Sequence, residues 1–282
     1  MATVPVLNRF CRECYNPPDA LYEKLKHQGL DLVTVTDHDS IDAAESLRRH
    51  ADFFLSEEVT CRAPSGNEFH IGAYDITEAQ HLEIQRRRND LPRLVAYLEE
   101  QRVFFSLNHV FSALTGRRAA EDFDWFEACF PAVEVLNGHL LARNNALAAR
   151  LASHNRRIAV GGSDAHALVS AGSAWTEVRG ARNKAEFLEG LREGRAEARG
   201  RSGSYWKLNC DILAITREMF REKPSTLLLA PLLFGIPSVT LLNYLLERRF
   251  ARKWGQVWAR MRGLDGDATV GQMPAATGEA TA

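Results

Sequence analysis

The sequence has too few cysteines for a framework of disulfide bonds. It contains five among 282 residues, an odd number, and they are scattered along the chain. Cys11 and Cys14 form a C-x-x-C pair, but one such pair without a second is a weak zinc motif, so we interpret both as ordinary cysteines. The composition therefore excludes the class of small secreted domains that depend on disulfides.

An excess of charge of one sign is also absent, and so is a leader segment. The formal net charge is −1, which gives no overall field that would attract nucleic acid or an anionic membrane. The first 25 residues contain no long apolar run after a basic start, so we predict no signal peptide and expect a cytoplasmic location. A charged substrate must then be held by local chemistry.

Residues 1–200 alternate between short β-rich runs and helix-length runs, which predicts an α/β domain with a parallel sheet and helical crossovers. Both an open doubly wound sheet and a closed barrel agree with this alternation. Strands are predicted at 31–37, 53–61, 69–76, 103–108, 133–136, 158–161 and 174–179. Helices are predicted at 19–27, 40–49, 79–101, 120–130, 140–154 and 184–193.

A Gly-, Arg- and Ser-rich stretch at 194–205 indicates a domain boundary, so residues 201–264 are predicted to form a helical C-terminal extension. An amphipathic helix is expected at 206–221. The uncharged run 224–246, followed by Arg248 and Arg249, is long enough to span a bilayer, which needs about 20 residues. The alternative, which we favour slightly, is two short apolar helices packed against the domain. Residues 265–282 lack apolar periodicity and are predicted to be disordered.

Acidic residues and histidines recur at the ends of the predicted strands or close to them. Because parallel strands deliver their carboxyl ends to one rim, these side chains are expected to converge there. Imidazoles and carboxylates together suit Zn, Mn or Fe, and their number exceeds the three or four ligands that one zinc usually takes. We predict a site for more than one metal ion built from His38, Glu58, His70, His109, Asp164 and His166.

Other polar residues are expected to have lesser roles. Strand alternation lets only one of Glu57 and Glu58 face the rim, and we choose Glu58. His139 follows a strand and remains a weak candidate, while Asp37 is either a ligand or a residue that orients His38. Four histidines that sit in predicted helices or at their ends are expected on the surface: His27, His50, His81 and His154.

The stretches GLDLVTVTDHDSIDA, SEEV, FHIGAYDI, LNHV and GGSDAHA, in this order and spacing, resemble the PHP (polymerase and histidinol phosphatase) family over about residues 17–200. This resemblance implies a distorted seven-stranded β/α barrel, similar to a TIM barrel. It also implies two or three divalent metal ions and the hydrolysis of phosphate mono- or diesters of small molecules, nucleotides or oligonucleotide ends.

The resemblance assigns the histidine after T-D to His38, the metal-bridging glutamate to Glu58 and the final D-x-H pair to Asp164 and His166. The two middle histidines of the family correspond to His70 and His109. His38, Glu58 and His166 are then the expected catalytic residues: Glu58 bridges two metal ions, and either histidine binds a third ion or protonates the leaving oxygen. Arg117 and Arg118 follow the loop after His109 and are candidates to grip phosphate.

One departure from the family pattern affects the expected activity. The family begins with a strand ending in D-L-H-x-H, whereas residues 1–16 contain no histidine. The chain therefore resembles a member that lacks the first strand and two ligands, either through a wrongly chosen start codon or through real shortening that impairs it. A rival function follows from the missing ligands, namely a non-catalytic metal-binding or interaction domain. A second rival, an amidohydrolase-like metal hydrolase, shares the barrel and ligands, but the TDHDS and SDAH flanks fit the PHP pattern better.

Overall fold

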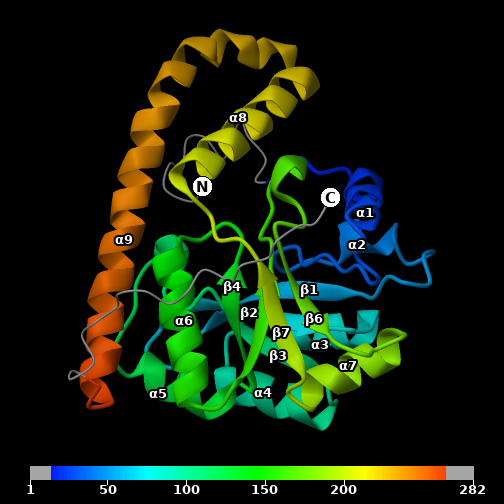
Figure 1. Cartoon of the computed structure of the whole chain (residues 1–282), viewed down its shortest axis with the longest axis vertical. Helices are drawn as coiled ribbons and strands as arrows, with labels where there is room; N and C mark the ends of the chain where they lie inside the picture. The colour runs from blue at the N-terminus through cyan, green and yellow to red at the C-terminus, as the bar shows by residue number, and fades with distance from the viewer. Residues whose placement is uncertain (1–13, 265–282) are drawn as a thin grey trace.

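The computed structural model describes residues 14–264 and shows a mixed α/β fold whose C-terminal helices rise from it as an arch (Figure 1). Five strands form one sheet in the order β1-β2-β3-β4-β5, and β6 pairs with β7 in a separate antiparallel hairpin. The strands are β1 (Ser56–Arg62), β2 (Glu68–Tyr74), β3 (Phe104–Asn108), β4 (Ala132–Asn137), β5 (Ile158–Gly162), β6 (Ala174–Val178) and β7 (Ala196–Gly200).

The five-stranded sheet is mixed, which corrects the expectation of a parallel sheet. β3, β4 and β5 run parallel, but β2 is antiparallel to both of its neighbours. β1 and β2 are joined by a tight turn in which the N–H of Ala63 donates to the carbonyl of Asn67, and Gly66 there has a φ of 84°, a left-handed conformation that glycine adopts readily. The short connection forces the second strand back along the first.

The segment predicted as a strand at 31–37 is extended but contributes only isolated bridges. Val33 pairs with Phe53 and His38 pairs with Glu58, so the segment lies parallel to β1 without forming a continuous ladder. Among the described residues the sheet remains open, and no closed seven-stranded barrel forms. The first strand of the family pattern would fall at the start of the chain, where residues 1–13 lie outside the described range.

Most of the predicted helices are present. The predicted helix 79–101 is two helices, because Asp90 caps a second one by accepting from the N–H of Arg93, and Pro92 stands in its first turn. The predicted helix 40–49 is helical only over Asp42–Glu45. The helices before residue 200 are α1 (Pro18–His27), α2 (Asp42–Glu45), α3 (Glu78–Arg87), α4 (Leu91–Glu100), α5 (Asp122–Cys129), α6 (Ala142–His154) and α7 (Lys184–Arg192), with short 3-10 helices η2 (Ala113–Thr115) and η3 (Leu168–Ser170).

The stretch 194–205 is not a linker throughout, because β7 lies within it and pairs with β6 along its whole length. α8 (Tyr205–Glu222) follows almost at once. The Ser170 hydroxyl donates to Asp211 of α8, and Lys207 of α8 donates to the carbonyl of Gly138. The extension thus packs on the strand-bearing part of the chain, and the division at residue 200 stays a prediction.

The rest of the arch consists of η4 (Pro224–Gly235), a 3-10 helix, and α9 (Ile236–Met261), which descends beside α6 (Figure 1). The C-terminal half of α9 packs firmly, with Trp258 fully buried. The apolar run 224–246 does not pack against the domain, because most of its large apolar side chains are exposed, and this corrects the interpretation we favoured. The predicted disordered tail, 265–282, lies outside the described residues.

Candidate metal centre

The strand directions bring the predicted ligands to one rim. β1 runs the same way as β3, β4 and β5, so residues late in or just after these strands meet at one end of the sheet. β2 runs the opposite way, and His70, near its start, therefore reaches the same end. His70 pairs with Thr60 of β1, two residues beyond Glu58, which places both side chains on one face.

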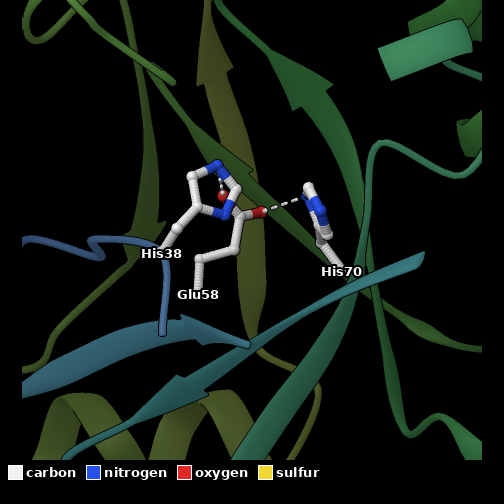
Figure 2. Close-up of side chains that lie close together, drawn as sticks. All are labelled: His38, Glu58 and His70. Carbon is white, nitrogen blue, oxygen red and sulfur yellow. Dashed lines mark ion pairs between the residues drawn. The ribbon is translucent and has the colours of Figure 1, made fainter. Parts of the chain in front are cut away.

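Three of the other five predicted ligands converge on the carboxylate of Glu58. His109 Nε2 lies 3.0 Å from Glu58 Oε1, and His70 Nδ1 lies 3.7 Å from the same oxygen. His38 Nε2 lies 3.5 Å from Glu58 Oε2, and Figure 2 shows the two rings of His38 and His70 on either side of the carboxylate. The amide of Asn108 donates to Glu58 Oε1 at 2.9 Å, which fixes the orientation of the carboxylate.

Asp164 and His166 form the other half of the centre, on the loop after β5. His166 Nδ1 lies 3.1 Å from the carbonyl oxygen of Asp164. The side-chain amide of Asn137 donates to both Asp164 Oδ2 and Glu134 Oε2, each at 3.0 Å. Glu134 in turn accepts the backbone N–H of His109 at 3.0 Å. A continuous polar network thus joins the Asp164 side to the Glu58 side.

These residues line a cavity of about 440 Å³ between the segment 34–38 and the end of β5. Its volume suits a small phosphorylated molecule, since ligand pockets commonly enclose about 300–1,000 Å³. Asn16 lies at its edge, where its side chain donates to the carbonyl of Ala165 between Asp164 and His166. The polar residues of the lining are Asn16, Thr34, Thr36, Asp37, His38, Glu58, Tyr74, Asn108, His109, Glu134, Asn137, Ser163, Asp164 and His166, together with Cys14.

Two candidate ligands have a left-handed backbone conformation that residues other than glycine seldom adopt. His109 has a φ of 30° and Asp164 a φ of 46°. Such conformations cost about 1–3 kcal/mol each and persist where the surroundings impose them, often at functional sites. Both residues directly follow or lie just beyond a strand end, so the turn directs their side chains into the cavity rather than along the next helix.

The electrostatics of the centre show why a cation suits it. Burial raises the pKa of Glu58, but the charge and the hydrogen bond of His109 outweigh this and lower it to about 2. Burial and the neighbouring His109 lower the pKa of His70 to about 3. For His109, burial lowers the pKa, yet the Glu58 carboxylate raises it to about 9. The shifts of Glu58 and His109 thus both favour positive charge beside this carboxylate, which is the condition that suits a bound cation.

The donor set fits divalent metal ions. His70 Nδ1 and His109 Nε2 lie 3.1 Å apart, and both face the same oxygen of Glu58. His38, Glu58 and His70 each offer a ligand atom, and these atoms lie within 4.8 Å of one another. Imidazole nitrogens and carboxylate oxygens crowded at such distances repel one another unless a proton or a cation lies between them.

Several other predicted placements need correction. His81 is not a surface residue, because its Nδ1 lies 2.8 Å from Oε2 of the fully buried Glu57, which faces away from the cavity toward α3. His50 stacks on Tyr22 instead of standing in solvent. Arg118 is buried, donates to backbone carbonyls and Thr115 and packs over the ring of Phe126, so it is not available to phosphate. His27 and His154 are exposed, as expected, and Arg117 is exposed outside the cavity lining.

The structure also shows roles that the sequence motifs did not reveal. Asn108 contacts Glu58, and Glu134 is buried beside the ligands, where burial raises its pKa to about 7. Asn108 occurs in the L-N-H-V stretch already singled out, and Glu134 lies in the strand predicted at 133–136, so their place in or at the end of a strand was the available signal. His139 lies beside His166, with ring centroids 5.7 Å apart, and 3.8 Å from Asp211 of α8. No motif predicted that α8 would reach this point.

Comparisons with known proteins agree with the family resemblance. Residues 142–196 match the PHP-associated family model. The fold is similar to that of PsfC from Pseudomonas syringae, with 17% identity over 74% of this chain and 93% of that chain and a TM-score of 0.54. We found no match among curated proteins.

Two further solved structures are similar at lower scores. The lesion-specific endonuclease EndoQ from Pyrococcus furiosus has 16% identity over 64% of this chain and 52% of that chain, with a TM-score of 0.48. An amidohydrolase from Chromobacterium violaceum has 14% identity over 65% of this chain and 93% of that chain, with a TM-score of 0.44. At these identities the likeness concerns the fold alone. The segment matched by the family model and the T-D-H-D-S and G-S-D-A-H motifs together agree with the resemblance of this chain to the PHP family.

Proposed function

We propose that the chain is a metal-dependent phosphoesterase that hydrolyses a phosphate mono- or diester of a small molecule or nucleotide. The observation that carries the proposal is the convergence of His38, His70 and His109 on the single carboxylate of Glu58, within 3.0–3.7 Å. Asp164 and His166 face the same cavity and complete a set of six ligands for two or three ions of Zn, Mn or Fe.

Divalent cations held there would neutralise charge on the phosphoryl group and lower the pKa of bound water, which supplies a nucleophile near neutral pH. The residues of the chain prepare the site for this chemistry. Asn108 and Asn137 orient the carboxylates of Glu58 and Asp164 through their amide N–H groups. His166 directs Nδ1 toward the carbonyl of Asp164, which leaves Nε2 free to hold a metal ion or to protonate the leaving oxygen.

The cavity walls agree with a small polar substrate. Tyr74 lies in the lining, and its hydroxyl is 3.0 Å from the hydroxyl of Ser106, while burial strongly raises the pKa of the phenol, so it stays a neutral hydrogen-bonding group. Within the described range 14–264, no arginine or lysine lines the cavity. Phosphate charge would therefore be balanced by the metal ions, which makes metal occupancy the first requirement for activity.

The test begins with the metal content of the purified protein. We expect at least one transition-metal ion per chain by elemental analysis, and hydrolysis of p-nitrophenyl phosphate or bis-p-nitrophenyl phosphate in the presence of Mn. Glu58→Gln keeps the shape of the side chain but removes its charge, and we expect it to weaken metal binding at least about 10–100-fold and to abolish turnover.

The matched control is His27→Ala, which removes an exposed histidine far from the cavity and should leave both properties unchanged. Metal uptake lost in Glu58→Gln, with no hydrolysis of any ester by the wild type, would instead favour the non-catalytic metal-binding alternative. Hydrolysis of an amide and not of a phosphate ester would favour the amidohydrolase alternative.

A further inference from the structure

The tip of the C-terminal arch, residues 224–246, carries no charged side chain and is mostly exposed. We refer to it as the apolar arch. Only Thr226 and Thr240 are buried within it, whereas Leu228 is 87% exposed and Phe234 is 91% exposed. The other exposed large apolar side chains of this segment are Leu227, Leu232, Val239, Leu241, Leu242, Leu245 and Leu246.

An apolar surface of this extent marks a site that something else covers. A groove for a partner helix would expose one stripe and bury the opposite face. In η4, by contrast, Leu227, Leu228, Leu232 and Phe234 are all exposed, and they are too closely spaced to lie on one stripe. A surface that is apolar around the helix suits immersion in a fluid apolar phase better than docking on one rigid face.

Exposed cations flank the apolar arch on both sides. Arg217 and Arg221 on α8 and Lys223 just after it precede the apolar arch, and a second group follows it on α9. Arg221 has an ion pair with Glu218, but for the second group the structure shows contacts with aromatic rings, Arg248 over Tyr244 and Lys253 over Trp254. The second group consists of Arg248, Arg249, Arg252 and Lys253. Positive charge next to an apolar segment is complementary to anionic lipid headgroups.

Both ends of the apolar arch are attached to the same domain. On the α8 side, Lys207 donates to Ser173 at 2.7 Å, and the Ser170 hydroxyl donates to Asp211. On the α9 side, Trp258 is buried in the core, and Arg262 binds Glu127 of α5 at 2.8 Å. Figure 1 shows the chain leaving through α8 and returning through α9. The segment Pro224–Met261 is long and apolar enough to cross a membrane by length and composition alone, but a crossing would separate two ends that the fold holds together.

We propose that the apolar arch inserts into one leaflet of an anionic lipid bilayer and returns, so that the protein is attached to one membrane surface without spanning it. The apolar part of α9, residues 236–246, extends about 15 Å at 1.5 Å per residue. That length is about half of the ~30 Å hydrocarbon thickness of a bilayer, which is the reach of one leaflet. The basic residues that follow it then lie at the level of the headgroups.

Flotation of the full chain with lipid vesicles tests the proposal. The protein should float with vesicles of phosphatidylcholine and phosphatidylglycerol and bind vesicles of phosphatidylcholine alone more weakly. The double variant Leu228→Glu, Phe234→Glu should lose flotation at least about 10-fold, and it should fold normally because both side chains are exposed. Leu82→Glu, which charges an exposed leucine on α3, is the matched control and should float like the wild type. Arg248→Glu with Arg249→Glu should remove the preference for anionic lipid.

The depth of insertion separates one leaflet from two. Phe234→Trp adds an indole at the tip, and lipids brominated at different positions along one chain should quench its fluorescence, while lipids confined to the far leaflet should not. Equal flotation of the wild type and the Leu228→Glu, Phe234→Glu variant would overturn the proposal. A second outcome would also overturn it: the wild type does not bind vesicles and forms a stable dimer by light scattering, and the same double variant is a monomer. A second copy of the chain would then cover the arch.

Discussion

Asn137 holds two carboxylates of the candidate metal centre at once. Its side-chain amide N–H groups donate to Glu134 and Asp164, and its side-chain carbonyl oxygen accepts hydrogen bonds from the backbone N–H groups of His139 and Leu140. The residue is almost fully buried, so water cannot replace these contacts without rearrangement. The position of Asp164 therefore depends on a residue that binds no metal itself.

We predict that Asn137→Ala weakens metal binding about 10–100-fold, because Asp164 loses the donor that orients it. Isothermal titration with Mn or Zn measures the effect. Asn155→Ala, at the end of α6, also removes a partly buried asparagine that bonds the backbone, but it lies away from the cavity and should bind metal as the wild type does. Equal affinity in Asn137→Ala and the wild type would show that Asp164 needs no such support.

At the scale of single elements, α9 is divided between an exposed apolar half and a half that belongs to the core. Trp258 packs against Phe111 and donates from its indole N–H to Glu127 at 2.6 Å. Gly255 allows this approach, because a Cβ there would lie 2.8 Å from the side chain of Leu147 on α6. The helix therefore packs on the domain through Gly255 and, about one turn later, Trp258.

We expect Trp258→Ala to lower the free energy of unfolding by about 3–5 kcal/mol, as for other fully buried aromatic residues. Trp206→Ala removes a tryptophan that is largely exposed on α8 and should change the free energy by less than about 0.5 kcal/mol. Urea unfolding followed by circular dichroism compares the two. Similar losses in both variants would mean that the return of α9 contributes little to stability.

Glu247 attaches the middle of α9 to the domain and makes that attachment dependent on pH. Its carboxylate accepts hydrogen bonds from the backbone N–H of Ala113 and from the side-chain amide of Asn144. Burial raises the pKa of Glu247, although its hydrogen bonds to Ser112 and to the N–H of Ala113 oppose that rise. A carboxyl whose pKa is raised on folding binds its proton more tightly in the native state. Its contribution to stability is therefore fully present below its ordinary pKa and is lost as the pH rises through the raised value.

The predicted consequence is a pH-dependent difference between Glu247→Gln and the wild type. The side chain of the variant cannot ionise, so the variant does not lose this stability as the pH rises. The difference in free energy of unfolding, variant minus wild type, should therefore increase from pH 5 to pH 8. The altered hydrogen bonds add a constant offset that does not change this slope. Thermal unfolding at several pH values gives the slope. A difference that decreases over this range would show that hydrogen bonds to the carboxylate outweigh its burial.

At the scale of the whole molecule, the metal centre joins segments that are distant in the sequence. His38 comes from an extended segment held to β1 by isolated bridges, Glu58 and His70 come from the antiparallel pair, and Asp164 comes from the loop after β5. Among the described residues the sheet is open between the first and the last of these segments. Bound metal ions would therefore connect these segments where hydrogen bonds between strands do not.

We expect removal of metal with a chelator to lower the melting temperature. Binding at 100 times the dissociation constant stabilises the native state by about 2.7 kcal/mol, which corresponds to roughly 5–10 °C for a domain of this size. Differential scanning calorimetry of the metal-loaded and chelated protein measures the change. Glu58→Gln should show a much smaller difference between the two conditions, and a full-sized difference in that variant would place the bound metal elsewhere.

The gathering of the candidate ligands at one rim was predictable because local sequence encodes strand ends. Alternation within β1 selected Glu58 over Glu57, and in the structure Glu58 faces the cavity while Glu57 bonds His81 on the other side. The antiparallel direction of β2 was missed, since the helix-length segment between β2 and β3 suggested a parallel crossover. The loss of Arg118 as a phosphate ligand was missed too, because its burial beneath Phe126 depends on distant packing.

The sequence by itself determined the motifs that resemble the PHP family, the order of most helices and strands and the identity of the residues gathered at the rim, because periodicity and strand-end residues are local properties. Tertiary structure alone decided three features: the open mixed sheet, the contact of α8 with the cavity wall through Asp211, and the exposure of the apolar arch. The physical reason is that an uncharged helical run has the same composition and periodicity whether it is buried, solvated or immersed in lipid. Only the anchoring of both its ends, by Lys207 and Asp211 on one side and Trp258 on the other, shows that it leaves the domain and returns.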